Sequence, residues 1–148
     1  MNKLFFMIIF GCSSVLAESP TSKTIDQYYA YASSGEWQQA LPIIKGLVES
    51  DASIPSRWFQ YGSCLEELGK HEEAIAAFAK AYQLDPTDFG AQYRIFRNYA
   101  LAGDVDGFVA FARLEVKKTP QIIERINQRE EFQSMTSSET YRAFLKQL

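Results

Sequence analysis

Apolar side chains recur at helical spacing through the middle of the chain, over Arg57–Pro86. In the first half of this stretch they fall at i, i+3, i+4 and i+7, which is one face of a helix. The second half repeats the spacing, and charged residues mostly lie off both faces. A turn at Gly69-Lys70 separates the halves, and Pro86 ends the second one. The stretch predicts a hairpin of two amphipathic helices, with stripes formed by Trp58, Tyr61, Gly62 and Leu65 and by Ala74, Phe78 and Ala81.

The hairpin pattern recurs more weakly on both sides of this stretch, at a constant spacing. Gly35, Gly69 and Gly103 are evenly spaced, and the same interval separates Pro86 from Pro120. A single hairpin cannot bury its apolar face alone, so neighbouring hairpins are expected to cover it. We therefore expect six helices in three stacked hairpins, with repeats at about 21–54, 55–88 and 89–120.

Two more helices are predicted after the third repeat, within 121–148. The first, Gln121–Gln128, carries an isoleucine stripe. The second follows Thr136-Ser137-Ser138-Glu139, which has the pattern of a capping box. Because the last hairpin of a stack exposes apolar surface, we expect these helices to cap it.

The central hairpin resembles a tetratricopeptide repeat. The family pattern is met at Trp58, Tyr61-Gly62, Leu65, Gly69, Ala74, Phe78, Ala81 and Pro86. The outer repeats are degenerate, since Thr24 and Gln92 stand where the tryptophan would be, and Phe108 and Ala112 exchange a small and a large residue. The resemblance extends from the first predicted repeat to the third. It implies an all-α fold, a right-handed solenoid of helical hairpins with three repeats plus C-terminal capping helices, and a non-catalytic protein-binding function.

Length, composition and net charge indicate an ordered domain and argue against a nucleic-acid-binding protein. The 148 residues suffice for one domain, and 47% hydrophobic and 14% aromatic residues exclude a disordered chain. The net charge of −3 argues against nucleic acid, which proteins meet with a basic surface.

The segment Met1–Ala17 has the pattern of a secretory signal peptide. Lys3 precedes a short apolar run, and Val15-Leu16-Ala17 suits a cleavage site. The run is too short to span a bilayer. Ile9-Phe10-Gly11-Cys12 offers a second interpretation, a lipoprotein signal that ends before Cys12 and leaves a membrane tether there. Either route predicts export of the repeat domain, residues 18–148. We expect the exported protein to be periplasmic or secreted, or anchored to the cell envelope through Cys12.

Few residues suggest catalysis. His71 is the only histidine, and Cys64 is the only cysteine after the leader, on the expected buried face. One histidine and one cysteine do not make a zinc site. Adjacent glutamates on a helix diverge by about 100°, so they do not form acid–base pairs. We expect no catalytic residue, no metal and no cofactor, although His71 leaves a hydrolytic role or an accessory subunit of an enzyme open as an alternative.

The resemblance also implies where a partner binds, because in this family the first helices of successive repeats line a concave groove. Ile25, Phe59 and Tyr93 share the repeat spacing, each one position past that of the tryptophan. We expect them to form a partly exposed stripe, whereas Trp58 is buried and Glu66 faces solvent. A groove with two arginines suits an extended or helical peptide with an acidic group. The candidate partner-binding residues are Ile25, Tyr29, Phe59, Gln60, Tyr93, Arg94 and Arg97.

Two alternatives stay open for this surface. The stripe would serve no partner if it only covers the inner face or packs on the chain's own residues 18–23. One subclass of the family binds chaperone tails through a two-carboxylate clamp, but of the five clamp positions only Arg94 matches, since Ile25, Tyr29, Gln60 and Gly90 hold the others. The leading hypothesis is an exported module that binds a protein or peptide, and the alternative is a lipid-anchored assembly factor of the envelope or a secretion complex.

Overall fold

The computed structural model describes residues 20–148. The predicted leader, 1–17, and the Cys12 tether lie outside these residues. The described part contains nine α-helices and one 3₁₀ helix and no strand. The elements are α1 (Pro20–Ser33), α2 (Trp37–Ser50), α3 (Pro55–Glu67), α4 (His71–Leu84), α5 (Phe89–Ala102), α6 (Val105–Lys118), α7 (Ile122–Asn127), η1 (Glu130–Phe132), α8 (Gln133–Thr136) and α9 (Glu139–Leu145).

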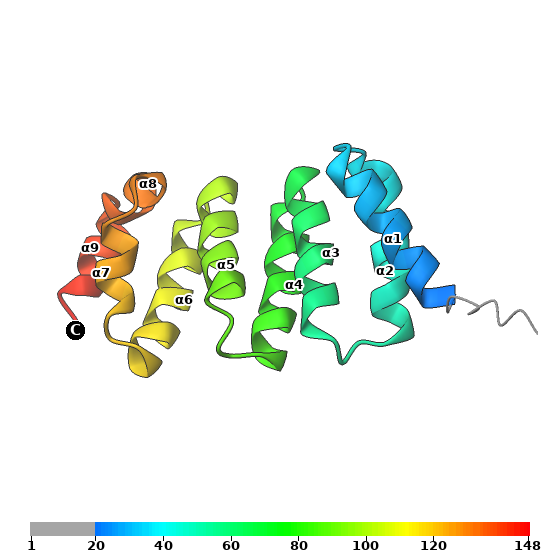
Figure 1. Ribbon diagram of the computed structural model, residues 1–148. Helices are drawn as coiled ribbons and strands as arrows, with labels where there is room; N and C mark the ends of the chain where they lie inside the picture. Colours follow the sequence, from blue (N-terminus) through cyan, green and yellow to red (C-terminus); the bar gives the residue numbers. More distant parts are fainter. Residues whose placement is uncertain (1–19) are drawn as a thin grey trace, which may run out of the picture.

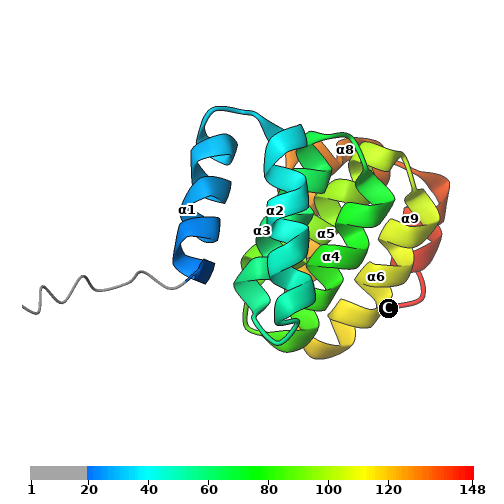
Figure 2. The same cartoon turned by 90° about the vertical axis from the view of Figure 1, so that its right-hand side faces the viewer.

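Successive helices pair into hairpins that stack side by side in a row (Figure 1). Helices α1, α3 and α5 form one layer, and α2, α4 and α6 form the other (Figure 2). The predicted fold class, an all-α solenoid of helical hairpins, is confirmed. Within the described residues, no helix is long and apolar enough to cross a membrane.

The turns inside the hairpins depend on the glycines that mark the repeat period. Gly35, Gly69 and Gly103 have φ angles of 73°, 71° and 70°. This left-handed conformation is one that glycine adopts without a steric penalty and that other residues adopt rarely. It lets the chain reverse direction within a few residues, so each glycine turn joins one helix to the antiparallel helix that follows.

The C-terminal cap differs from the prediction in two respects. A third short segment, η1 followed by α8, lies between the two expected helices and buries Phe132 and Met135. The last helix is capped by Ser138, whose Oγ accepts a hydrogen bond of 3.2 Å from the Tyr141 amide. Thr136 instead ends α8, so the predicted capping box is wrong in register.

The cap does cover the end of the stack, as expected. Phe108 and Ala112 of α6 are fully buried, which confirms that the two exchanged residues share one face. Phe108 lies edge-on to both Phe132 and Tyr141, with ring centroids 5.4 and 6.2 Å apart. The large residue on α6 therefore interlocks with the capping helices rather than with another repeat.

Helix α3 packs closely on α4 at Gly62. A β-carbon placed on Gly62 would lie 2.9 Å from Cε1 of Phe78, which is fully buried. Trp58, one turn earlier, is only half-buried, and its indole N–H donates to the carbonyl of Ala52 at 2.8 Å. The prediction of a buried Trp58 is wrong because this side chain lies where the helix begins, beside the preceding loop.

A buried carboxylate joins three helices of the second and third hairpins. Glu115 of α6 is 1% exposed and accepts hydrogen bonds of 2.7 Å from Tyr82 of α4, Gln92 of α5 and Lys118. Burial alone raises the pKa of Glu115, but the hydrogen bonds from Lys118, Tyr82 and Gln92 outweigh it and hold the pKa below its ordinary value of 4.5.

Gly62→Ala and Gly46→Ala form a matched pair that tests the close packing. Both glycines are inside helices, so each substitution gains up to about 1 kcal/mol of helix propensity. Gly46 has nothing within 4 Å of the new β-carbon, so Gly46→Ala should stabilise the protein. Gly62→Ala should destabilise it by about 1–3 kcal/mol, because the ring of Phe78 has to move. Urea unfolding measures both, and equal effects would show that α3 and α4 are not in close contact there.

Glu115 should make stability depend on pH in acid. A carboxyl whose folded pKa is lowered stabilises the fold above its unfolded pKa and loses that contribution as the pH falls through the folded pKa. Glu115→Gln should therefore cost about 1–3 kcal/mol at pH 7, and the difference from the natural protein should shrink below pH 4.5. The exposed control, Glu49→Gln, should change the free energy of unfolding at pH 7 by less than about 0.5 kcal/mol. Denaturant titrations between pH 7 and pH 3 provide the test.

Candidate peptide-binding groove

The seven predicted partner-binding residues come from the first helices of the three hairpins. Ile25 and Tyr29 lie on α1, Phe59 and Gln60 on α3, and Tyr93, Arg94 and Arg97 on α5. Tyr29 is 52% exposed, and the other six are partly exposed. Side chains that remain accessible on three adjacent helices of one layer are available to an extended ligand.

The first contact in this layer joins α1 to α3. The side chain of Gln60 donates a short hydrogen bond from Nε2 to the hydroxyl of Tyr29. The hydroxyl of Tyr28 lies 3.5 Å from the main-chain carbonyl oxygen of Gln60. The other atom of the Gln60 amide, Oε1, is buried and has no hydrogen-bond partner among the described residues. An unpartnered buried acceptor costs stability, whereas the Nε2 end of the same amide joins α3 to α1.

The second contact joins α3 to α5. Phe59 packs edge-on against Phe78, with centroids 5.3 Å apart, and the guanidinium carbon of Arg94 lies 6.0 Å from the centroid of its ring. Phe59 also borders a surface hollow together with Pro55, Ser56, Gln60, Asp85, Asp88 and Gly90. The small residue at Gly90 leaves this hollow open, because a β-carbon there would lie 3.6 Å from the Phe59 ring.

Glu66 contradicts the prediction that it faces solvent. Its side chain is 3% exposed, and one of its oxygens accepts from both Arg94 and Arg97. Its second oxygen accepts from Asn98, whose own Oδ1 lies 3.0 Å from Nδ1 of His71. Side chains from α5 cover this side of α3, so a residue outside the apolar stripe is still buried.

This ion-pair cluster changes the role expected of the two arginines. The sequence predicts that both meet an acidic group of a ligand, but both already pair with the carboxylate of Glu66, which offsets one of their two positive charges. Their side chains are 32% and 36% exposed, so each presents an edge to solvent while it remains paired. They therefore hold α5 against α3 and contribute less positive charge to the groove than the sequence indicates.

The C-terminal cap covers part of Tyr93. Its hydroxyl donates to Glu131 at 2.7 Å, and the guanidinium carbon of Arg129 lies 4.4 Å from its ring centroid. Burial, followed by the hydrogen bond to Glu131, raises the pKa of Tyr93. The stripe thus packs in part on the chain itself, through residues 129–131.

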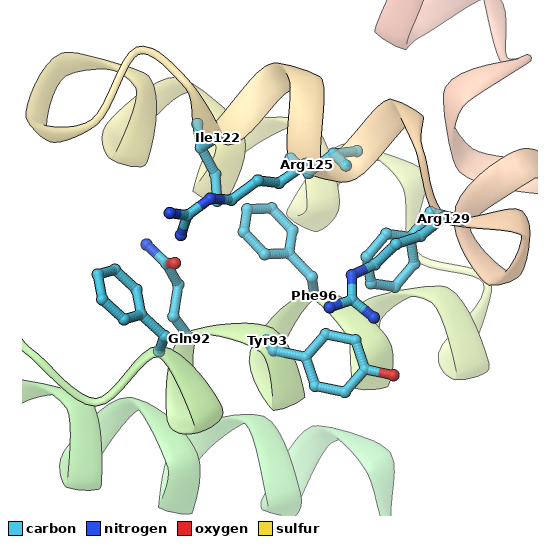
Figure 3. Close-up of a pocket in the computed structure, with 9 residues that line it drawn as sticks. Gln92, Tyr93, Phe96, Ile122, Arg125 and Arg129 are labelled. Atoms are coloured by element: carbon cyan, nitrogen blue, oxygen red, sulfur yellow. The ribbon is translucent and has the colours of Figure 1, made fainter.

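A small pocket lies beside Tyr93, between α5 and α7. It has a volume of about 90 Å³, and Figure 3 shows its lining. The lining residues are Phe89, Gln92, Tyr93, Phe96, Ile122, Arg125, Ile126, Arg129 and Phe132. Sequence reasoning found only Tyr93 among them, because the repeat period stops before α7 and gives no register for Arg125 on α7 or for Arg129 after it.

The candidate chemical groups are poorly placed for catalysis. Cys64 is fully buried, and burial raises the pKa of its thiol to about 11, so it is a thiol rather than a reactive thiolate at neutral pH. His71 points to Asn98 inside the ion-pair cluster. Over the part of the chain that the structure describes, no three His, Cys, Asp or Glu residues are close enough to hold a metal ion.

Comparison with known proteins agrees with the fold. Residues 26–89, from α1 to the start of α5, match the family model described as tetratricopeptide repeat. This match supports the assignment of the chain to the tetratricopeptide repeat proteins. No curated protein matches the chain. A tetratricopeptide repeat domain indicates a module for protein–protein interaction.

Glu66→Gln and Glu67→Gln test the buried ion pair at adjacent positions. Glu67 lies nearer the surface, so its substitution should change stability by less than about 0.5 kcal/mol. Glu66→Gln removes the charge that faces two guanidinium groups and should destabilise by about 1–3 kcal/mol, a moderate figure because the arginines are partly solvated. Thermal and urea unfolding compare the two variants, and equal stability would show that the cluster contributes nothing.

Proposed function

We propose that the chain is a non-catalytic adaptor that binds a protein or peptide partner along the α1–α3–α5 layer. The observation that carries this proposal is the unbroken row of partly exposed side chains across that layer. Tyr29 meets Gln60, Phe59 meets Arg94, and Tyr93 meets Arg129 of the cap. Each member lies at the surface, and each is held by a neighbour from an adjacent element.

Such a row suits a ligand better than it suits the fold. Aromatic side chains lose few rotamers on binding, and interface anchors are enriched in tyrosine and arginine. Here the row combines Tyr29, Phe59 and Tyr93 with two arginines whose positions are fixed by Glu66. Side chains that are fixed before binding lose less entropy when a ligand arrives.

We also propose that the adaptor works outside the cytoplasm. The support is the leader pattern in Met1–Ala17, with its apolar run and cleavage site. A module that acts by binding needs no cofactor supply after export. The partner would then be a protein or peptide of the periplasm, the envelope or the medium.

Substitutions in the row should weaken binding more than folding. Phe59→Ala should reduce capture of the partner by a factor that corresponds to about 2 kcal/mol, as is typical for an interface anchor. Tyr93→Phe, which keeps the ring but loses the hydroxyl bond to Glu131, separates the aromatic contact from the bond to the cap. Partners are identified by crosslinking the tagged full-length protein in its own cells, and each variant's capture is compared with its melting temperature.

Leu114→Ala provides the matched control for this experiment. Leu114 lies on α6 in the other layer and is 58% exposed, so its loss removes apolar surface away from the groove. Its capture should equal that of the natural protein. If capture by Phe59→Ala falls only in proportion to its loss of stability, the row serves the fold and the proposal is wrong. The intact mass of the recovered protein reports the leader, with a start at Glu18 for an ordinary signal or a lipidated Cys12 for an anchor.

A further inference from the structure

The pocket between α5 and α7 has an apolar interior. Phe96, Ile122, Ile126 and Phe132 are each no more than 4% exposed, and they form its inner wall. An apolar cavity of about 150 Å³ holds a benzene molecule. At about 90 Å³ this pocket is matched to a smaller group, such as a branched aliphatic side chain, and is too small for an indole.

Two arginines, Arg125 on α7 and Arg129 just after it, line the pocket. Arg129 lies over Tyr93 and also pairs with Glu131 at 3.3 Å. The guanidinium carbon of Arg125 lies 5.0 Å from the ring centroid of Phe89, and no ion pair joins Arg125 to an acidic residue in the described part of the chain. Phe89 is 55% exposed, which is high for a phenylalanine, and its ring holds the guanidinium at the pocket mouth.

An amide faces Arg125 across the mouth. Gln92 is 3% exposed, and its Nε2 is turned inward to donate to Glu115 at 2.7 Å. An ionised carboxylate only accepts hydrogen bonds, so it fixes which end of the amide points inward. The carbonyl oxygen of Gln92 is thereby left on the pocket side, and Figure 3 shows the amide and the Arg125 guanidinium pointing toward one another.

The apolar interior, Arg125 and Gln92 together favour one kind of ligand group. The apolar interior takes an aliphatic group, the guanidinium of Arg125 binds a carboxylate, and the carbonyl of Gln92 accepts an N–H. A branched aliphatic residue at the end of a peptide carries all three on one α-carbon and its substituents. An Asp or Glu within a peptide does not meet this requirement, because its carboxylate and the aliphatic group would belong to different residues.

We propose that this pocket binds the C-terminal residue of a partner peptide, a Val, Leu or Ile with a free α-carboxylate. The inference rests on the proposed peptide-binding function and adds an end point to it. The pocket adjoins Tyr93, so the rest of the peptide continues from it across Phe59 toward Tyr29. The cap thus contributes recognition as well as closing the stack.

The test measures binding of fluorescein-labelled hexapeptides to the full chain by fluorescence anisotropy. The probe Gly-Ser-Gly-Ser-Gly-Leu with a free carboxylate should bind roughly 10-fold or more tightly than its C-terminal amide, because a charge-assisted hydrogen bond is lost. Gly-Ser-Gly-Asp-Gly-Leu amide carries the same charge as the free acid and should bind as weakly as the amide. Replacing the last residue by Trp should also weaken binding.

Arg125→Gln and Arg113→Gln distinguish the pocket from general charge. Arg113 stacks on Phe144 at the same 5.0 Å, but on α6 and away from the pocket. Arg125→Gln should remove the preference for the free acid, whereas Arg113→Gln should keep it, with melting temperatures checked for both. The inference is overturned if acid and amide bind alike, if no probe binds, or if both variants lose the preference equally.

Two further experiments identify the kind of ligand and distinguish a failure of this inference from a failure of the proposed function. If N-acetyl-leucine competes as strongly as the hexapeptide acid, the site belongs to a free small acid and the peptide assignment is wrong. If Arg125→Gln captures the cellular partner as well as the natural protein does while Phe59→Ala does not, the groove function stands and the C-terminal pocket does not.

Discussion

Every hairpin in this protein leaves an apolar face that only the next element can cover. Ala74 and Phe78 of α4 are fully buried because α3 lies on one side of them and α5 on the other. The close approach at Gly62 is possible because no side chain separates α3 from Phe78. This dependence on neighbours orders the molecule along one axis. It also explains why the last hairpin needs the aromatic cap formed by Phe132, Tyr141 and Phe144.

The seams between hairpins also contain buried charge. Glu66 joins α3 to α5 through two arginines and Asn98, and Glu115 joins α6 to α4 and α5. A buried carboxylate is stable only when all of its hydrogen-bond partners are in place. Each cluster therefore favours one relative position of adjacent hairpins. Both clusters also fix side chains that reach the first-helix layer. Arg94, Arg97 and Gln92 are therefore held in fixed positions by buried carboxylates.

The sequence predicted the elements that depend on local spacing and missed those that depend on contact between repeats. Gly35, Gly69 and Gly103 revealed three hairpins because a left-handed turn leaves a local mark at a fixed period. Glu66 was placed in solvent because an apolar stripe defines one buried face, whereas α3 has two. Trp58 lies on the apolar stripe and was predicted to be buried, but it stands near the start of α3 beside the preceding loop and is only half-buried. The pocket was missed because Arg125 belongs to the cap, whose residues have no repeat period, and only the fold brings it near Gln92.

The cap combines a buried apolar side with an edge that carries two arginines. Closing the stack requires apolar residues, and Ile122, Ile126 and Phe132 are buried in the same cluster as Phe108 of α6. Yet the opposite edge of the cap carries Arg125 and Arg129, whose guanidinium groups lie over Phe89 and Tyr93 of α5. A lid that only closed the stack would gain little from stacking cations on exposed aromatic rings, since such contacts at the surface are worth about 0.5–1 kcal/mol. Helix α7 thus continues the layer of first helices begun by α1, α3 and α5, and extends the candidate groove by one helix beyond the three repeats.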